Sequence, residues 1–182
     1  MTLIKSSLAR RQPSVSSVLA NSHVRPGGVQ RARIEASSPE PRQFPFQLTD
    51  RTIYVRLYEE EPNWLYSALT KLQTLAAMPE NWDSHRGSPI TSEAIFAALT
   101  FMAEYLPDST REPSIVPASV GGLQLEWHRM AGDLEVTFTA EGAMTAYFAN
   151  TTSGEEWDME FRSMNSQRLA AAIDSVTVES VN

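Results

Sequence analysis

The chain has 182 residues, of which 42% are hydrophobic, and a formal net charge of −7. It contains no cysteine, which excludes disulfides, thiolate nucleophiles and cysteine-based zinc sites. No apolar run approaches the roughly 18 residues that a membrane helix needs. The first residues also lack the apolar block of a secretory signal. We therefore expect one domain plus appendages, and the lack of cysteine is compatible with a reducing compartment.

Charge is distributed unevenly along the chain. Residues 1–47 carry a net charge of +5, whereas the remainder carries −12. Residues 1–47 are also rich in Ser, Pro, Arg and Gln and show no periodicity, which predicts a disordered basic tail. Two alternatives stay open, namely a segment that folds on a partner and an Arg- and Ser-rich transit peptide. We place a single α+β domain at residues 48–178, and its acidity argues against nucleic acid binding outside the tail 1–47.

Two helices are predicted in the first half of this domain. Residues 52–58 alternate in polarity and form either an edge strand or the lead-in to a helix. Apolar positions then recur at helical spacing, so we place the first helix at about 62–77. The second helix is predicted to begin at a cap on Thr91 or Ser92 and to end at Pro107.

An antiparallel meander follows the helices. A short edge strand is predicted between Pro113 and Pro117, because proline lacks the donor that an inner strand requires. Further strands are predicted at about 122–129, 132–140 and 143–150, with a last one around 157–161. The predicted fold is α+β: an antiparallel four- to five-stranded meander with two helices N-terminal to it and a short C-terminal helix packed on one face.

Alternating residues also fix a register between the second and third strands of the meander. A turn at residues 129–132 places His128 opposite Asp133 and Glu126 opposite Glu135. The same register pairs Trp127 with Leu134 on the other face, so both faces are consistent at once. One face of this ribbon is therefore predicted to be apolar and the other rich in carboxylates.

The facing glutamates suggest three interpretations. Like charges across a ladder repel, so compensation is expected from Arg86, from Arg111, from a cation or from a shared proton. A divalent ion held by Glu126, His128, Asp133 and Glu135, or acid/base chemistry on these groups, would use this face as an enzyme site. The alternative is that the four residues are ordinary solvated side chains on the wet side of a sheet.

The loop at residues 79–89 is the second candidate site. Trp82 is a large ring in a loop, where it either covers a core edge or offers a binding platform, and Asp83 is a typical turn residue. The chain has no G-x-S-x-G elbow, no P-loop and no G-x-G-x-x-G fingerprint. We therefore assign no catalytic residue and no cofactor.

Several of these segments together resemble a known group of sequences. They are Pro79-Glu80-Asn81-Trp82-Asp83-Ser84, Pro113-Ser114-Ile115-Val116-Pro117, Gly121-Gly122-Leu123-Gln124-Leu125-Glu126-Trp127-His128, Asp133-Leu134-Glu135-Val136 and Gly154-Glu155-Glu156-Trp157. Over about residues 62–162 the chain resembles a group of short uncharacterised bacterial proteins with the pattern NWDS…PxVVP…GGxQLEWH…DLEV. The resemblance implies a bacterial, cytoplasmic, one-domain protein and implies no catalytic role.

Two functions follow as hypotheses. The first is a non-enzymatic protein-interaction module, accessory, antitoxin-like or immunity-like, with an acidic folded surface and a flexible basic tail. Its partner is expected to be a basic protein encoded nearby, bound through Glu126, His128, Asp133, Glu135, Trp82 and Asp83. The alternative is a small metal-dependent enzyme that uses the first four of these residues.

Overall fold

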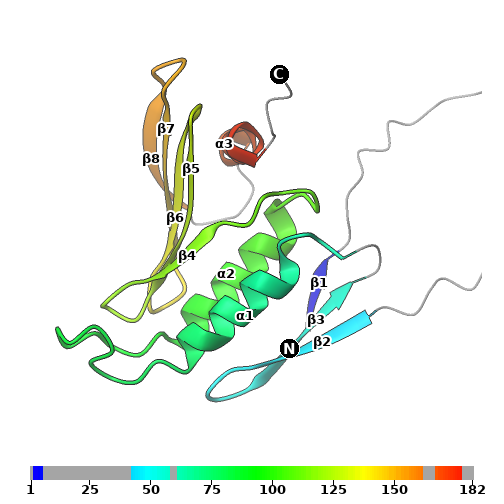
Figure 1. Ribbon diagram of the computed structural model, residues 1–182, viewed down its shortest axis with the longest axis vertical. Helices are drawn as coiled ribbons and strands as arrows, with labels where there is room; N and C mark the ends of the chain where they lie inside the picture. Colours follow the sequence, from blue (N-terminus) through cyan, green and yellow to red (C-terminus); the bar gives the residue numbers. More distant parts are fainter. Residues whose placement is uncertain (1, 6–41, 58–60, 162–166, 178–182) are drawn as a thin grey trace, which may run out of the picture.

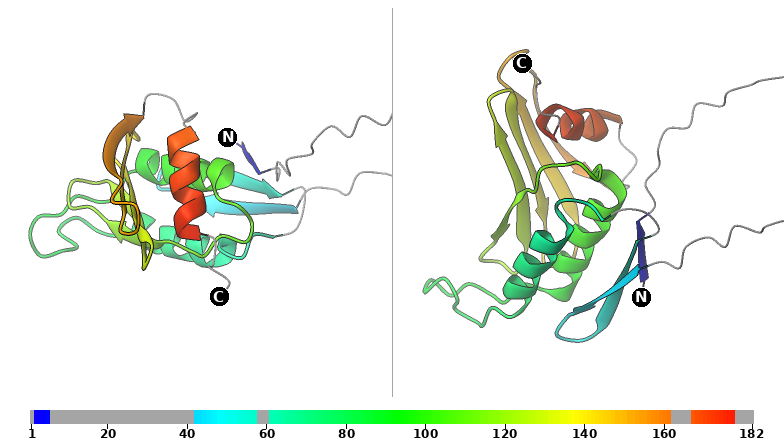
Figure 2. Two further views of the ribbon diagram at one scale, coloured as in Figure 1. Left: turned by 90° about the horizontal axis from the view of Figure 1, so that it is seen from above. Right: turned by 45° about the vertical axis from the view of Figure 1, so that its right-hand side comes forward.

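The computed structural model describes residues 2–5, 42–57, 61–161 and 167–177. The elements lie in three layers: a five-stranded sheet, a layer of helices, and a three-stranded sheet on the far side of helices α1 and α2 (Figures 1 and 2). The fold is therefore α+β, as the sequence predicts. Among the described residues, no helix is both long enough and apolar enough to span a membrane.

The five-stranded sheet is an antiparallel meander, which confirms the central prediction. Its strands, in spatial order, are β4 (Ser114–Pro117), β5 (Leu123–Arg129), β6 (Gly132–Phe138), β7 (Met144–Asn150) and β8 (Glu156–Phe161). Strand β4 lies at an edge of the sheet, where the missing N–H group of its terminal proline costs no hydrogen bond between strands.

The predicted register of β5 on β6 is also confirmed. Glu126 pairs with Glu135, His128 with Asp133, and Trp127 with Leu134. Every second residue of β5, β6 and β7 is buried, so one face of the sheet forms much of the core. A shift by one residue would exchange the two faces, which is why the apolar pattern specifies the register so strongly.

Helices cover only the apolar face of this sheet. They are α1 (Leu65–Ala76), α2 (Ser92–Tyr105) and α3 (Gln167–Thr177), and Figure 2 shows all three on the same side of the sheet. Thr91 caps α2, because its hydroxyl oxygen accepts a hydrogen bond from the Ala94 amide at 3.1 Å. Helix α3 packs on β5 and β6, and Arg129 donates from Nε to the Val176 carbonyl at 3.3 Å.

Helix α1 begins three residues later than the predicted start at residue 62. The preceding residues instead tie the chain to the loop after α2: the Asn63 amide donates to the Asp108 carbonyl at 3.0 Å. The buried Trp64 ring donates from Nε1 to the Pro107 carbonyl at 3.1 Å. The first N–H groups of a helix have no partner within the helix, so these long-range bonds satisfy donors and hold the start of α1 against that loop. A pattern of local spacing does not reveal them.

A second, three-stranded sheet lies behind the helices. It consists of β1 (Thr2–Lys5), β2 (Arg42–Gln47) and β3 (Thr52–Leu57), with β3 in the middle, parallel to β1 and antiparallel to β2. For residues 52–58 the sequence left two alternatives, an edge strand or the lead-in to a helix. The described residues of this segment form a strand, and it lies in the middle of this second sheet.

Placing all of residues 1–47 in a tail was wrong at both ends of that segment. Strand β2 belongs to the folded part, where Phe46 is 2% exposed and pairs with the fully buried Ile53. Only two apolar residues of β2 reach the core, and this is too little periodicity for the sequence alone to predict a strand. Residues 6–41 lie outside the described part of the structure.

Candidate interaction surface

The side of the five-stranded sheet that faces away from the helices is the candidate site, and we call it the open face. Alternation along the paired strands places its residues: Ser114, Val116, Gln124, Glu126, His128, Asp133, Glu135, Thr137, Thr145, Tyr147, Ala149, Glu156, Asp158 and Glu160. Six of these are carboxylates and none is Lys or Arg. Within the described part of the chain, this side of the sheet therefore carries acidic groups on β5, β6 and β8 and no permanently cationic side chain.

His128 links two of the carboxylates. Its Nδ1 lies 3.0 Å from an Asp133 oxygen on the neighbouring strand, and its Nε2 lies 3.2 Å from a Glu126 oxygen on its own strand. The hydrogen bond to Asp133 first, and then the one to Glu126, raises the pKa of His128 above its ordinary value. The protonated ring can donate to both carboxylates at once, so part of the negative charge is neutralised locally as the pH falls.

The expected compensation for the Glu126–Glu135 pair comes from within the sheet. Gln124 donates from Nε2 to a Glu135 oxygen at 2.6 Å, while Glu126 accepts from His128. The suggestion that Arg86 or Arg111 neutralises the pair was wrong, because in the described part of the chain neither guanidinium bonds to these carboxylates. The carbonyl of Arg111 instead accepts from Trp127 Nε1 at 3.0 Å, on the apolar side.

The second half of the open face was missed by the sequence reasoning. Tyr147 donates from its hydroxyl to Glu156 at 3.0 Å, and this bond raises the pKa of Tyr147 above its ordinary value. Asp158 pairs with Tyr147, and Glu160 pairs with Thr145. A groove of about 440 Å³ runs between these side chains and Glu135. The signal was present, because the predicted alternation of residues 157, 159 and 161 already places the intervening acidic residues on the opposite face.

The open face offers little support for a metal centre. His128 forms hydrogen bonds with two carboxylates, those of Asp133 and Glu126, and the Gln124 side chain donates a hydrogen bond to Glu135. Among the described residues, no group of three or more His, Cys, Asp or Glu side chains is arranged to hold a metal ion. The geometry therefore gives the metal-dependent alternative no ligand set built from Glu126, His128, Asp133 and Glu135.

The loop at residues 79–89 is held by its own side chains. Asp83 accepts from the amides of His85 at 2.7 Å and Gly87 at 2.8 Å, which lowers the pKa of Asp83. Asn81 accepts from the Arg86 amide at 2.7 Å, and Trp82 donates from Nε1 to the Ser88 carbonyl at 3.0 Å. Three non-glycine residues, Asn81, Ser84 and Arg86, have left-handed backbones with φ between 62° and 69°. The hydrogen bonds of Asp83 thus stabilise the conformation of the loop itself.

The structure divides the predicted partner-binding residues between two places. Ser88 forms a bridge with Val120 just before β5 begins, so the loop lies at that end of β5. His128 lies at the other end of the same strand, beside the turn to β6. The loop projects past the sheet on the side of the open face (Figure 1). Trp82 and Asp83 therefore flank this surface at one end, while Glu126, His128, Asp133 and Glu135 form a cluster toward the other.

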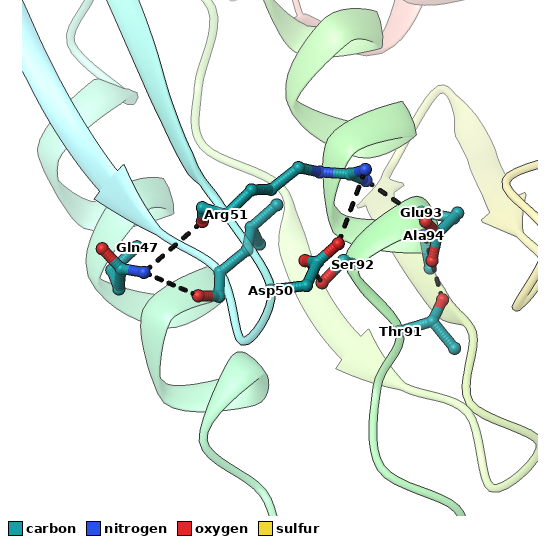
Figure 3. Close-up of polar contacts among 8 residues, drawn as sticks. Gln47, Asp50, Arg51, Thr91, Ser92, Glu93 and Ala94 are labelled. Carbon is teal, nitrogen blue, oxygen red and sulfur yellow. Dashed lines mark hydrogen bonds and ion pairs between the residues drawn. The ribbon is translucent and has the colours of Figure 1, made fainter. Parts of the chain in front are cut away.

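A second concavity lies on the helix side of the sheet. It has a volume of about 550 Å³ and lies between the start of α2, the turn from β6 to β7 and the end of β8. Arg51 of the β2–β3 turn and Glu93 of α2 line it, and their side chains lie 3.2 Å apart. Figure 3 shows this contact among the polar contacts between that turn and the start of α2. The Ser92 hydroxyl donates to Asp50 at 2.6 Å, and this bond lowers the pKa of Asp50. The small sheet is thus joined to the start of α2.

Comparisons with known proteins add no name to these observations. The chain matches no protein-family model, and the comparisons with curated proteins and with solved structures found no match either. Any functional conclusion therefore depends on the geometry of the open face.

Proposed function

We propose that the protein is a non-enzymatic interaction module whose open face binds a basic segment of a partner protein. One observation carries the proposal: six carboxylates lie on the open face, with His128 as its single group that can become cationic and no Lys or Arg. An ordinary solvated sheet face mixes both charge signs, because like charges on neighbouring strands destabilise the sheet. A surface of one sign steers an oppositely charged partner and excludes partners of its own sign.

The dimensions of the open face indicate the length of segment that it can hold. Its three central strands have seven residues each, which at about 3.3 Å per residue span roughly 23 Å. An extended segment of about seven residues matches this length.

Apolar side chains on and beside this surface supply contacts that charge alone does not. Val116 lies on the open face and is 39% exposed, and Met130 in the turn after β5 is 100% exposed. Tyr147 lies near the middle of the face, between Glu135 and Asp158. Aromatic and Met side chains are enriched where proteins bind one another, since aromatic rings bury much area and the flexible Met side chain adapts its shape to the partner.

A charge-neutralised variant tests this proposal. The triple variant Glu135→Gln, Asp158→Asn, Glu160→Gln neutralises the carboxylates that line the groove of the open face and keeps a hydrogen-bond acceptor at each position. We expect it to bind a synthetic peptide of alternating Lys and Val about 3- to 150-fold more weakly than the native chain, since each exposed ion pair contributes about 0.2–1 kcal/mol. Calorimetric titration at low ionic strength measures the affinity, and added salt should weaken native binding.

A matched variant controls for net charge. Glu80→Gln, Glu104→Gln and Asp174→Asn remove the same number of charges from exposed positions outside the open face. This control should bind the peptide about as tightly as the native chain. Equal losses in both variants would mean that only net charge matters, and native binding in the first variant would remove the open face from the interaction; either result contradicts the proposal.

A further inference from the structure

Strand β8 is an edge strand with a hydrogen-bonding side that is not used within the sheet. It pairs with β7 on one side, and no strand of the described part of the chain pairs with its other side (Figure 1). The Asn150 amide donates to the Glu155 carbonyl at 2.7 Å, and the following pairs keep the same register. Because hydrogen-bonded pairs alternate in an antiparallel ladder, Trp157, Met159 and Phe161 bond to β7. The N–H and C=O groups of Glu156, Asp158 and Glu160 therefore point toward the free edge.

The side chains along this edge are sorted by face. Glu156, Asp158 and Glu160 are exposed on the open face, whereas Met159 and Phe161 are partly buried on the helix side. A strand added beside β8 would place every second side chain next to these carboxylates and the others next to Trp157, Met159 and Phe161. The edge is thus complementary to a segment in which basic residues alternate with apolar ones.

The concavity on the helix side offers a place for one of the apolar side chains. Phe161 lies at the end of β8 and lines the 550 Å³ cavity together with Met144 of β7 and Phe96 of α2. A residue that pairs beside Phe161 and points to the helix side lies at the mouth of this cavity. The cavity would then give the added strand an anchor that fixes its register along β8.

A second copy of the chain is a poor occupant of the same edge. Antiparallel pairing of two β8 strands would set the three carboxylates of one copy among the three of the other, and facing like charges destabilise a ladder. Acidic side chains on an edge strand are a common way to prevent such self-association. Charge complementarity therefore selects a basic strand over a second copy of the acidic β8.

We propose that β8 accepts an extended segment of the partner as a sixth strand, with Lys or Arg facing Glu156, Asp158 and Glu160 and apolar residues facing the helix side. This mode is β-strand addition, in which main-chain hydrogen bonds supply affinity and alternate side chains supply specificity. The inference depends on the proposed function, since it names the conformation and the pattern of the basic segment that the open face attracts.

A pair of variants at one position tests the main-chain bonds. Asp158→Ala removes the charge and keeps the outward N–H, whereas Asp158→Pro removes both and leaves the ladder to β7 unchanged. We expect Asp158→Ala to weaken binding of the alternating Lys–Val peptide by a few-fold, and Asp158→Pro to weaken it about tenfold further. Equal affinities of the two variants would overturn strand addition. Circular dichroism and thermal unfolding check that both variants are folded.

Hydrogen exchange on the native chain provides a readout that needs no variant. When the peptide saturates the protein, the amides of Asp158 and Glu160 should exchange at least several-fold more slowly, because they donate to the added strand. Unchanged exchange at both amides would contradict strand addition. A peptide of the same composition with all Lys residues in one block should bind more weakly, and equal binding of the two peptides would count against the alternating pattern.

These results separate the two proposals. If the triple variant of the groove carboxylates loses binding while Asp158→Ala and Asp158→Pro bind equally, the open face binds the peptide without strand addition and only the further inference fails. If the triple variant binds like the native chain, the proposed function itself fails.

Discussion

The two faces of the five-stranded sheet are built from alternate residues of the same strands and have opposite roles. The apolar face is covered by α1, α2 and α3 and carries fully buried side chains such as Leu125, Leu134 and Val136. The open face carries six carboxylates at the intervening positions and no covering element within the described residues. The difference shows which residues fold the protein and which are free for another task.

The stability of the sheet should therefore depend almost entirely on one face. Burial of apolar side chains contributes roughly 25 cal/mol for each Å² removed from water. Solvated carboxylates that face one another contribute nothing comparable and oppose folding slightly. A surface that costs stability and nevertheless carries carboxylates without Lys or Arg is what the proposed binding function requires.

The largest expected effect is on the apolar face. Phe138 is 1% exposed and its ring packs edge-on against Phe101, with centroids 5.8 Å apart. Phe138→Ala should lower the free energy of unfolding by about 3–5 kcal/mol, because it leaves a cavity in the core. Thr137→Ala, one residue away on the open face, should cost at most about 1 kcal/mol. Urea denaturation measures both, and similar losses would mean that the faces do not differ in this way.

A smaller, pH-dependent effect is expected at His128. Its pKa is raised in the folded state, so its stabilisation is fully present below the ordinary value of about 6.5 and is lost as the pH rises through the folded pKa. His128→Gln should therefore cost more stability near pH 6 than near pH 8. The difference should stay below about 1 kcal/mol, since the His128 side chain is 55% exposed and solvent screens the pair.

The partner of His128 offers a control for this pH effect. In an Asp133→Asn background the carboxylate that contributes most to the raised pKa is neutral. The pH dependence of His128→Gln should then shrink. The same pH dependence in both backgrounds would mean that the 3.0 Å contact between His128 and Asp133 does not control the titration.

The sequence predicts the large sheet well because its signals are local and redundant. Alternation in β5 and β6, a turn at residues 129–132 and prolines beside β4 all agree, so even the pairing of Glu126 with Glu135 follows from the residue pattern alone. The cap of Thr91 on α2 is predicted for the same reason, since capping uses residues three positions apart.

The parts that the sequence does not predict depend on long-range partners. Strand β2 pairs with β3 and packs on α1, but its own residues show little alternation. The residues before α1 are held by the bond from the Asn63 amide to the Asp108 carbonyl. The hydrogen bond to Glu135 comes from Gln124, which lies diagonally across the ladder. The sequence alone does not show whether Gln124 or an arginine of a nearby loop supplies this bond.

The stability of a variant that lacks the carboxylates of β5 and β6 tests the contrast between the two faces most directly. Urea denaturation at pH 8 and low salt compares the native chain with the variant Glu126→Gln, Asp133→Asn, Glu135→Gln. If the carboxylates serve binding, the variant should be as stable as the native chain or up to about 1 kcal/mol more stable, because facing like charges are removed. A loss of more than about 1 kcal/mol would show that these charges help to hold the sheet together, and would contradict the account.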